Sequence, residues 1–450
     1  MKTKITLLIM LASFAFLAAT DQVTVYNDNF ALVRTNTKLD LTKGMQSYFF
    51  ENIPSTIEAN SVIVESNSKG LEIFSQNYEY DLANTSKILT KYIGKEIEII
   101  TKSDNKFEGM LIFQDHETIG IQDENGKLDL IRVAEIRNFN LAKLPENFFL
   151  KPTLHWKLQT NNKGKFPIEL SYICTGMSWN VTYNAVWNDE AGNLEVNSWV
   201  TMNNVSGKAF ENIKLKLVAG EVNKIRSNEY RYDRSGLQEF AAMDMMAKGG
   251  SPSFEEKAFH DFHMYTLSGK VSVNHNQTKQ LRLYPTTLVK AKSRYVYKTH
   301  GTKIASMIVF DNTEKDGLGK PLPKGTIKIY KTDSADDNME FIGEDNISHT
   351  PVEEEISLTT GYAFDLVGET TVLDTKKISR HITQKQMQVK LKNRYEVKKE
   401  IVVKHNIYGD WEITKENVHY EKKKSNEIEF KRILTSGEEF ILTWTETIEH

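Results

Sequence analysis

Hydrophobic and polar residues alternate with a period of two along most of this chain. Such alternation predicts half-buried β-strands, because successive side chains of a strand point to opposite faces of the sheet. The clearest cases are VTVY at 23–26, SVIVE at 61–65, LKLVA at 215–219, TIKIYK at 326–331, MQVKLK at 387–392 and EIEFKRI at 427–433. Helical periodicity is scarce, and the clearest short helix is predicted for Thr85–Gly94, where Gly94 would end it. We therefore predict a mainly β fold built from tandem immunoglobulin-like β-sandwiches.

An aromatic row within Ser171–Trp187 has two interpretations, a platform for a ligand such as a sugar chain or the inner face of a sheet. One parity carries polar residues, and the other carries Trp179, Val181, Tyr183, Ala185 and Trp187. Half-buried strands usually turn their aromatic residues inward, and each buried aromatic ring removes about 150–250 Å² from water. We predict that this row belongs to the core.

Three stretches share one design, in which a strand ends in Asn and a polar turn leads into another alternating strand. They begin at Trp199, Val309 and Val389, and their asparagines are Asn204, Asn312 and Asn393. Asn suits turns because its side chain bonds nearby backbone groups and it tolerates positive φ. We predict a hairpin at each stretch, in a recurrent geometry typical of related immunoglobulin-like units.

Two segments depart from the long alternating pattern. Tyr92–Ile136 contains five short strands with Gly109 and Gly126 at turns, which predicts a small barrel of the SH3 or Sm type. Asn228–His263 joins a Met/Ala-rich stretch to a GGSPS breaker, which predicts a flexible excursion. The predicted organisation is a signal peptide at 1–20, an N-terminal β segment at 21–85, the small barrel at 86–145, a central β-sandwich segment at 146–227, the excursion at 228–265 and a C-terminal β-sandwich at 266–450.

The first residues resemble an export signal, with Lys2 and Lys4 ahead of the apolar stretch Ile5–Ala19. That stretch is short for a membrane span, which needs about 20 residues, and no second apolar run follows. We predict a periplasmic or extracellular protein without a transmembrane span in the mature chain. Because Cys174 is the only cysteine, no intrachain disulfide forms and core burial must hold the fold together.

The charge balance argues against a nucleic-acid partner. The net charge is -3, the sequence pI is about 6.5, and acidic and basic residues are interspersed. The lysine run 422–424 is most simply a solvated edge or turn. Sm-like barrels bind RNA, yet the predicted barrel has an acidic excess that would repel phosphate. Its basic residues are Lys95, Lys102, Lys106, Lys127, Arg132 and Arg137, and its acidic residues are Glu96, Glu98, Asp104, Glu108, Asp115, Glu117, Asp123, Glu124, Asp129 and Glu135.

The chain resembles a bacterial domain-of-unknown-function family numbered, in words, forty-one thirty-nine and known as mucoidy inhibitor A-like. The segments that carry the resemblance are 23–64, LSYICTGMSWNVTYNAVW at 170–187, 199–223, 263–284, LPKGTIKIY at 322–330, 347–366 and 409–434. The resemblance implies an exported or envelope-associated, largely β protein without established catalytic residues. Many relatives carry long coiled-coil arms, but this chain has no heptad run, and the predicted barrel takes that place.

Candidate chemistry is sparse. His260 and His263 lie at a spacing that one helix face could present, but a zinc site needs at least three protein ligands. Cys174 has no sequence signature of activation by a base, and an unpaired Cys is usually a small buried hydrophobe. The carboxylate runs Glu353–Glu355 and Asp336–Asp337 fit polar loops, because glycoside hydrolysis needs two carboxyls about 5–9 Å apart across a cleft. We therefore predict no catalytic, cofactor-binding or metal-binding residues, and no cofactor.

The leading hypothesis is a non-enzymatic exported binding or scaffold protein of the bacterial cell envelope. Its partner would be a protein or a cell-envelope polymer, and loops at the sandwich ends would carry recognition. The alternative is a protein that binds or acts on a polysaccharide through exposed aromatic residues and a carboxylate pair. The oligomeric state and the identity of the partner are left open by the sequence.

Overall fold

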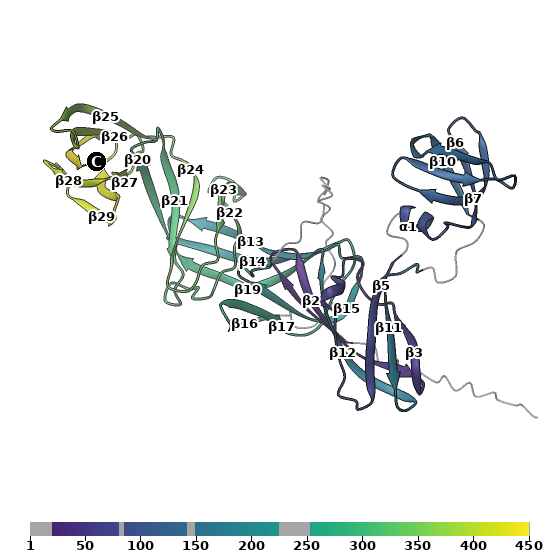
Figure 1. The fold of residues 1–450 in the computed structure, drawn as a ribbon. Helices are drawn as coiled ribbons and strands as arrows, with labels where there is room; N and C mark the ends of the chain where they lie inside the picture. Colours follow the sequence, from purple (N-terminus) through teal and green to yellow (C-terminus); the bar gives the residue numbers. More distant parts are fainter. Residues whose placement is uncertain (1–19, 81–84, 142–148, 225–252, 450) are drawn as a thin grey trace, which may run out of the picture. The chain divides into compact units, whose positions relative to one another are not determined.

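Strands make up nearly all of the regular structure of this chain (Figure 1). The computed structural model describes residues 20–80, 85–141, 149–224 and 253–449. They form several separate sheets, which confirms the predicted mainly β fold of multiple sandwiches. The chain divides into two compact units, and segment 146–227 contributes strands to both. No helix among these residues is long and apolar enough to cross a membrane.

The first unit contains two sheets besides the small module at 85–141. One has the order β15-β1-β2-β12-β4 with β18 beside β15, and the other has the order β3-β11-β5. The elements are β1 Thr20–Tyr26, β2 Phe30–Leu41, β3 Gly44–Phe50, the 3₁₀ turn Ala59–Ser61, β4 Ile63–Glu65, β5 Leu71–Glu79, β11 Thr153–Thr160, β12 Gly164–Thr175, β15 Phe210–Ala219 and β18 Val271–Val273.

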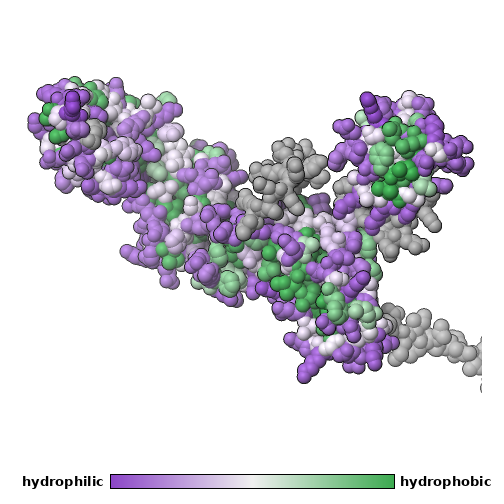
Figure 2. Space-filling model, viewed as in Figure 1, coloured by the Kyte–Doolittle hydropathy of each residue, from purple (hydrophilic) through white to green (hydrophobic). Residues whose placement is uncertain are grey.

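The small module has the predicted helix and the predicted five strands. Helix α1 spans Thr85–Thr90, and the chain turns through Gly94, whose φ of 80° favours glycine at the end of the helical segment. The strands β6 Glu96–Thr101, β7 Lys106–Gln114, β8 Thr118–Gln122, β9 Leu128–Arg132 and β10 Ile136–Leu141 form one sheet, with a 3₁₀ turn at Val133–Glu135. An apolar area lies on this module (Figure 2).

The predicted small barrel of the SH3 or Sm type has its five strands in one sheet, but that sheet does not close. The strand order is β10-β6-β7-β8-β9, so β10 and β9 are the edges of the sheet and do not pair with each other. A barrel requires the first and last strands to join. Strand lengths and turns can be read locally, whereas closure depends on whether the sheet coils far enough to bring its edges together.

The second unit contains three further sheets and a hairpin. The sheets have the orders β19-β14-β13-β22-β23, β24-β21-β20-β27-β30-β29 and β25-β26-β31-β28. The strands of the first sheet are β13 Met177–Asn188, β14 Asn193–Asn204, β19 Gln277–Lys290, β22 Gly325–Thr332 and β23 Met339–Ile347. Those of the six-stranded sheet are β20 Lys292–Lys298, β21 Ile304–Asp311, β24 Glu355–Tyr362, β27 Lys399–Asn406, β29 Tyr420–Lys424 and β30 Glu427–Leu434.

The four-stranded sheet shares a core with the six-stranded sheet. It consists of β25 Leu366–Lys377, β26 Ile382–Asn393, β28 Asp410–Thr414 and β31 Glu439–Glu449. Val389, Ile401, Phe430 and Trp444 are among the buried residues that form one cluster from both sheets. Each of these residues follows the period-two pattern, so this C-terminal sandwich buries the face that the alternation predicts.

All six strands predicted from alternation exist, whereas the three predicted hairpins are wrong. β14 and β15 lie in different sheets, as do β21 and β22, and β26 and β27. Each asparagine is fully buried at the point where the chain leaves one sheet for another. The Nδ2 atom of Asn393 donates to the carbonyls of Val397, Leu434 and Thr435 at 2.9, 3.1 and 3.0 Å.

The same asparagine contacts recur in the other two connections. Nδ2 of Asn204 donates to the carbonyls of Lys208, Val273 and Asn274, and Nδ2 of Asn312 donates to those of Lys320 and Pro351. A buried side-chain amide that donates to several backbone carbonyls can stabilise a connection between two sheets or the turn of a hairpin equally well. The local sequence therefore predicted a recurrent asparagine-centred connection, but it did not predict that the two flanking strands belong to different sheets.

The predicted flexible excursion is also corrected in part. Residues 228–252 lie outside the described residues. Phe254–Phe259 and Phe262–Leu267 form the antiparallel hairpin β16–β17. Tyr265 is fully buried, so tertiary burial stabilises a hairpin whose charged first strand conceals the alternation.

Candidate functional site

The aromatic row is buried, which confirms the core interpretation. Trp179, Tyr183 and Trp187 on β13 are only 2, 1 and 7% exposed. The indole N–H of Trp179 donates to the Val218 carbonyl at 3.2 Å, and the Tyr183 hydroxyl donates to the Pro323 carbonyl at 2.8 Å. Burial raises the pKa of Tyr183 well above its ordinary value. These rings cannot serve as an exposed sugar platform.

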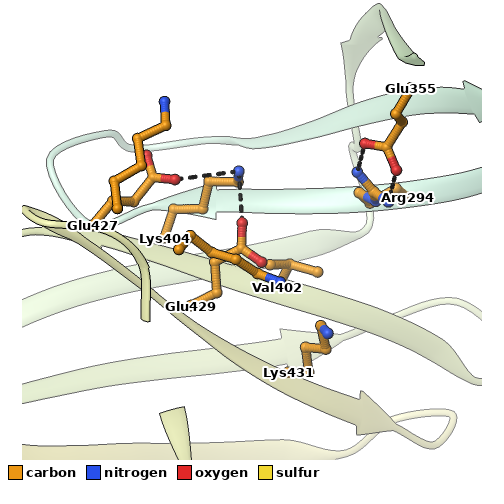
Figure 3. A pocket seen from close by; sticks show the side chains of 9 residues that line it. Arg294, Glu355, Val402, Lys404, Glu427, Glu429 and Lys431 are labelled. Carbon is orange, nitrogen blue, oxygen red and sulfur yellow. Dashed lines mark hydrogen bonds and ion pairs between the residues drawn. The ribbon is translucent and has the colours of Figure 1, made fainter. Parts of the chain in front are cut away.

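A charged groove on the six-stranded sheet is a candidate site (Figure 3). It has a volume of about 350 Å³ and draws its lining from β20, β24, β27, β29 and β30. The lining contains five basic side chains, three acidic side chains and one valine. They are Arg294, Lys404, Lys423, Lys424 and Lys431, then Glu355, Glu427 and Glu429, and Val402. We call this set the charged groove.

Ion pairs set the shape of the charged groove. Arg294 holds Glu355 through two parallel hydrogen bonds of 2.7 and 2.9 Å, the bidentate geometry that fixes both groups. The Arg294 hydrogen bond keeps the pKa of Glu355 below its ordinary value. Lys404 lies 2.7 Å from Glu429 and 3.8 Å from Glu427. The three carboxylates of the groove therefore each face a base.

The basic side chains of the groove outnumber the carboxylates that face them. Lys423 and Lys431 share the carboxylate of Glu421, at 2.8 and 2.7 Å, and their hydrogen bonds lower the pKa of Glu421 to about 2. Within the described part of the chain the side chain of Lys424 forms neither an ion pair nor a hydrogen bond. An anion entering the groove would find donors without displacing every existing partner.

A bulge in edge strand β29 distributes the three lysines of the run 422–424. The register between β29 and β30 shifts between Lys422 and Lys424, and a bulge of this kind re-aims side chains. Nζ of Lys422 lies 4.5 Å from the centre of the Trp411 ring, whereas Lys423 and Lys424 line the groove. The predicted solvated edge is confirmed, and two of its lysines converge on one site.

A buried polar cluster lies on the opposite face of the same sheet. Nδ1 of His405 contacts the Thr299 hydroxyl at 2.7 Å, and Nε2 contacts Glu446 at 2.7 Å. The order of hydroxyl, imidazole and carboxylate resembles that of a hydrolase triad. Thr299 is only 6% exposed, however, and the neighbouring Trp444 ring is 1% exposed, so a substrate carbonyl cannot reach the hydroxyl. We interpret the cluster as a link between two sheets.

The residues singled out from the sequence are dispersed in the structure. His260 lies in the β16–β17 turn, and His263 contacts Glu256 on the facing strand at 2.7 Å. Cys174 is completely buried on β12, as predicted for a small hydrophobe. Asp336 bonds the Asn338 backbone N–H inside a turn. No group of three His, Cys, Asp or Glu side chains among the described residues could hold a metal ion.

Glu355 is the one candidate that the structure brings into the charged groove. The sequence showed it only as the end of an acidic run, and Arg294, its partner, lies sixty-one positions earlier. The basic members were visible only as the lysine run, since nothing local indicates that β20, β27 and β30 lie side by side. Charged residues at alternate positions of a half-exposed strand, as in MQVKLK, are too common to indicate a binding site.

The comparisons with known proteins add no family. No family model matches this chain, and a search of curated proteins finds no match. The resemblance to the mucoidy inhibitor A-like family therefore stays a prediction. The predicted signal peptide lies almost entirely outside the described residues.

Proposed function

We propose that this protein is an exported, non-enzymatic binding protein of the cell envelope and that its charged groove binds an acidic polymer. The observation that carries the proposal is Lys424, a cation without an ion-pair partner among the described residues, beside two lysines that share one carboxylate. Alternating donors and acceptors along the groove suit a chain with many hydroxyls and sparse negative charges, such as an acidic polysaccharide.

The arrangement of the carboxylates favours binding over catalysis. A general acid needs a raised pKa to hold its proton near neutral pH. Glu355 has a lowered pKa because Arg294 bonds it, and Glu427 and Glu429 both face Lys404. These groups are therefore suited to holding lysine and arginine side chains in place for a ligand.

Polymer binding by the purified mature protein tests the proposal. Polygalacturonate would serve as the acidic polymer and dextran as the neutral control, with binding measured by calorimetry at two salt concentrations. We expect binding to polygalacturonate alone, weakened by salt because the contacts are between exposed charges. Lys424→Glu should weaken binding at least tenfold.

Lys422→Glu is the matched control, since Lys422 lies on the same strand but contacts Trp411 outside the groove. It should change binding less than threefold. Equal losses in the two variants would show that only the general charge of the edge strand matters and would reject the groove as the site. Equal binding of dextran would reject the acidic specificity.

A polysaccharide-acting protein is the second candidate, because three carboxylates do line one groove. The aromatic residues of β13 do not support this function, since Trp179 and Trp187 are buried. Release of new reducing ends from polygalacturonate, lost in Glu429→Gln, would establish this function in place of simple binding. An unchanged chain length after prolonged incubation would support binding alone.

A further inference from the structure

The outer face of the small module carries a cluster of exposed apolar side chains that the proposed function does not use. Met110 and Ile112 on β7 are 44 and 38% exposed, and Leu128 and Leu130 on β9 are 47 and 63% exposed. We call these four residues the apolar edge patch. They contrast with Leu111, Ile119, Ile121 and Ile131 on the inner face, which are at most 5% exposed.

Strand register places Met110, Leu128 and Leu130 of the apolar edge patch on one surface. Met110 pairs with Gln122, which pairs with Leu128, so the two apolar side chains belong to one row across three strands. In the next row Gly120 pairs with both Phe113 and Leu130. A Cβ on Gly120 would lie 2.4 Å from the Phe113 ring, so the glycine allows this ring to approach the backbone of β8 closely. The patch thus continues to the edge of the sheet.

The edge itself is open. β9 pairs only with β8 among the strands that the structure describes, because the sheet does not close onto β10. An exposed strand with apolar side chains offers unpaired backbone groups to an added strand, and proteins usually block such edges with lysine, proline or a covering element. Leu128, Leu130 and Arg132 occupy alternate positions of β9, and all three are exposed. Arg132 is therefore the one basic residue on this face of β9 that could hinder the pairing of an added strand.

The acidic residues around the apolar edge patch indicate that its partner carries basic side chains. The module contains ten acidic and six basic residues between Tyr92 and Arg137. The ion pairs of this module use Glu98, Asp104, Glu108 and Asp129. Glu96, which pairs across the sheet with Met110, and Glu124, in the β8–β9 turn, form no ion pair in the described chain. The surface is apolar with an acidic surround.

We propose that β9 receives an extended segment of another protein in which Lys or Arg alternates with apolar residues. The segment adds as a sixth strand, its backbone pairs with the free edge of β9, and its apolar side chains extend the row of Leu128 and Leu130. Its basic side chains face the carboxylates around the patch. This surface belongs to a different module from the charged groove and does not depend on it.

Hydrogen exchange of the full chain with and without a probe peptide tests the proposal. The probe is an eight-residue peptide that alternates Lys with Val, and the comparison peptide alternates Glu with Val. We expect the Lys peptide to slow exchange of β9 amides at least tenfold more than those of β3, and the Glu peptide to bind at least tenfold more weakly. Equal binding of both peptides would overturn the charge complementarity.

Two variants distinguish peptide binding at the apolar edge patch from nonspecific binding to exposed apolar residues elsewhere. Leu130→Lys changes a side chain that is already 63% exposed, so the fold should persist, and it should weaken Lys-peptide binding at least tenfold. Ile63→Lys, at a 58% exposed position on β4, should leave binding within twofold. If the wild-type protein is a dimer that Leu130→Lys converts to a monomer, and the peptide does not bind, then a second copy of this chain occupies the edge of β9 and the proposal is overturned. Unchanged β9 exchange in a monomer would also overturn it.

Discussion

The two faces of β27 and β30 use charged residues in opposite ways. On the outer face Lys404 and Glu429 form an ion pair within the lining of the charged groove. On the inner face His405, the next residue after Lys404, is 4% exposed and bonds Thr299 and Glu446 within the core. One strand therefore supplies a charged surface and a fixed internal link. The difference shows that burial, more than residue type, decides what a charged side chain does.

The largest effect should come from Trp444, which packs beside the inner cluster. Trp444 is 1% exposed and lies 4.9 Å from Phe430, ring to ring. Trp444→Ala should cost about 3–5 kcal/mol because it opens a large cavity in the shared core. Hydrogen exchange of β27 and β31 amides measures this loss. A change below about 1 kcal/mol would contradict the account of the core.

The next effect should come from removing the carboxylate of Glu446. Glu446→Leu leaves His405 and the Trp444 indole N–H without their buried acceptor and should cost about 1–3 kcal/mol. Glu355→Leu on the outer face is the comparison. It breaks a better-formed pair with Arg294, yet water replaces the lost partner. If both variants cost the same, the contrast between the faces would fail.

The pH dependence of stability should separate the two faces further. Burial raises the pKa of Glu446, but the hydrogen bond and charge of His405 outweigh it, so the folded pKa lies below its ordinary value. A lowered carboxyl pKa stabilises the fold above the unfolded pKa of about 4.3. That stabilisation is lost as the pH falls through the folded pKa.

Glu446→Gln measures this contribution, because an amide keeps an acceptor but does not titrate. Stability followed by hydrogen exchange at several pH values between about 3 and 6 should fall less steeply in the variant than in the wild type. Parallel profiles would show that Glu446 has the same pKa in the folded and unfolded states.

The smallest effect is expected for Arg294 in the groove. Arg294→Ala removes an ion pair that is partly exposed, and such pairs contribute about 0–1 kcal/mol. Exchange of the β20 amides should therefore stay close to that of the wild type, while polygalacturonate binding weakens. A loss above about 2 kcal/mol would place Arg294 with the structural residues of the inner face and exceed what exposed pairs supply.

Local patterns predicted the strands and the buried aromatic row well. Trp179, Tyr183 and Trp187 are buried because alternate side chains of β13 share a face, a property of the extended backbone itself. The predicted hairpins failed because Asn204, Asn312 and Asn393 have the same local chemistry in a crossing between sheets as in a tight turn. The hairpin at Phe254–Leu267 escaped prediction because burial of Tyr265 is a tertiary event.

The sequence by itself determined which residues could be core, which segments would be extended and that the fold would be mainly β. Those properties follow from side-chain direction along a strand, which neighbours in the chain already specify. Only the tertiary structure decided which strands became neighbours, that the small sheet stayed open at β9, and that Arg294, Glu355, Lys404 and Lys424 met in one groove. Strand partners are chosen by burial and register between distant segments, so no local pattern can name them.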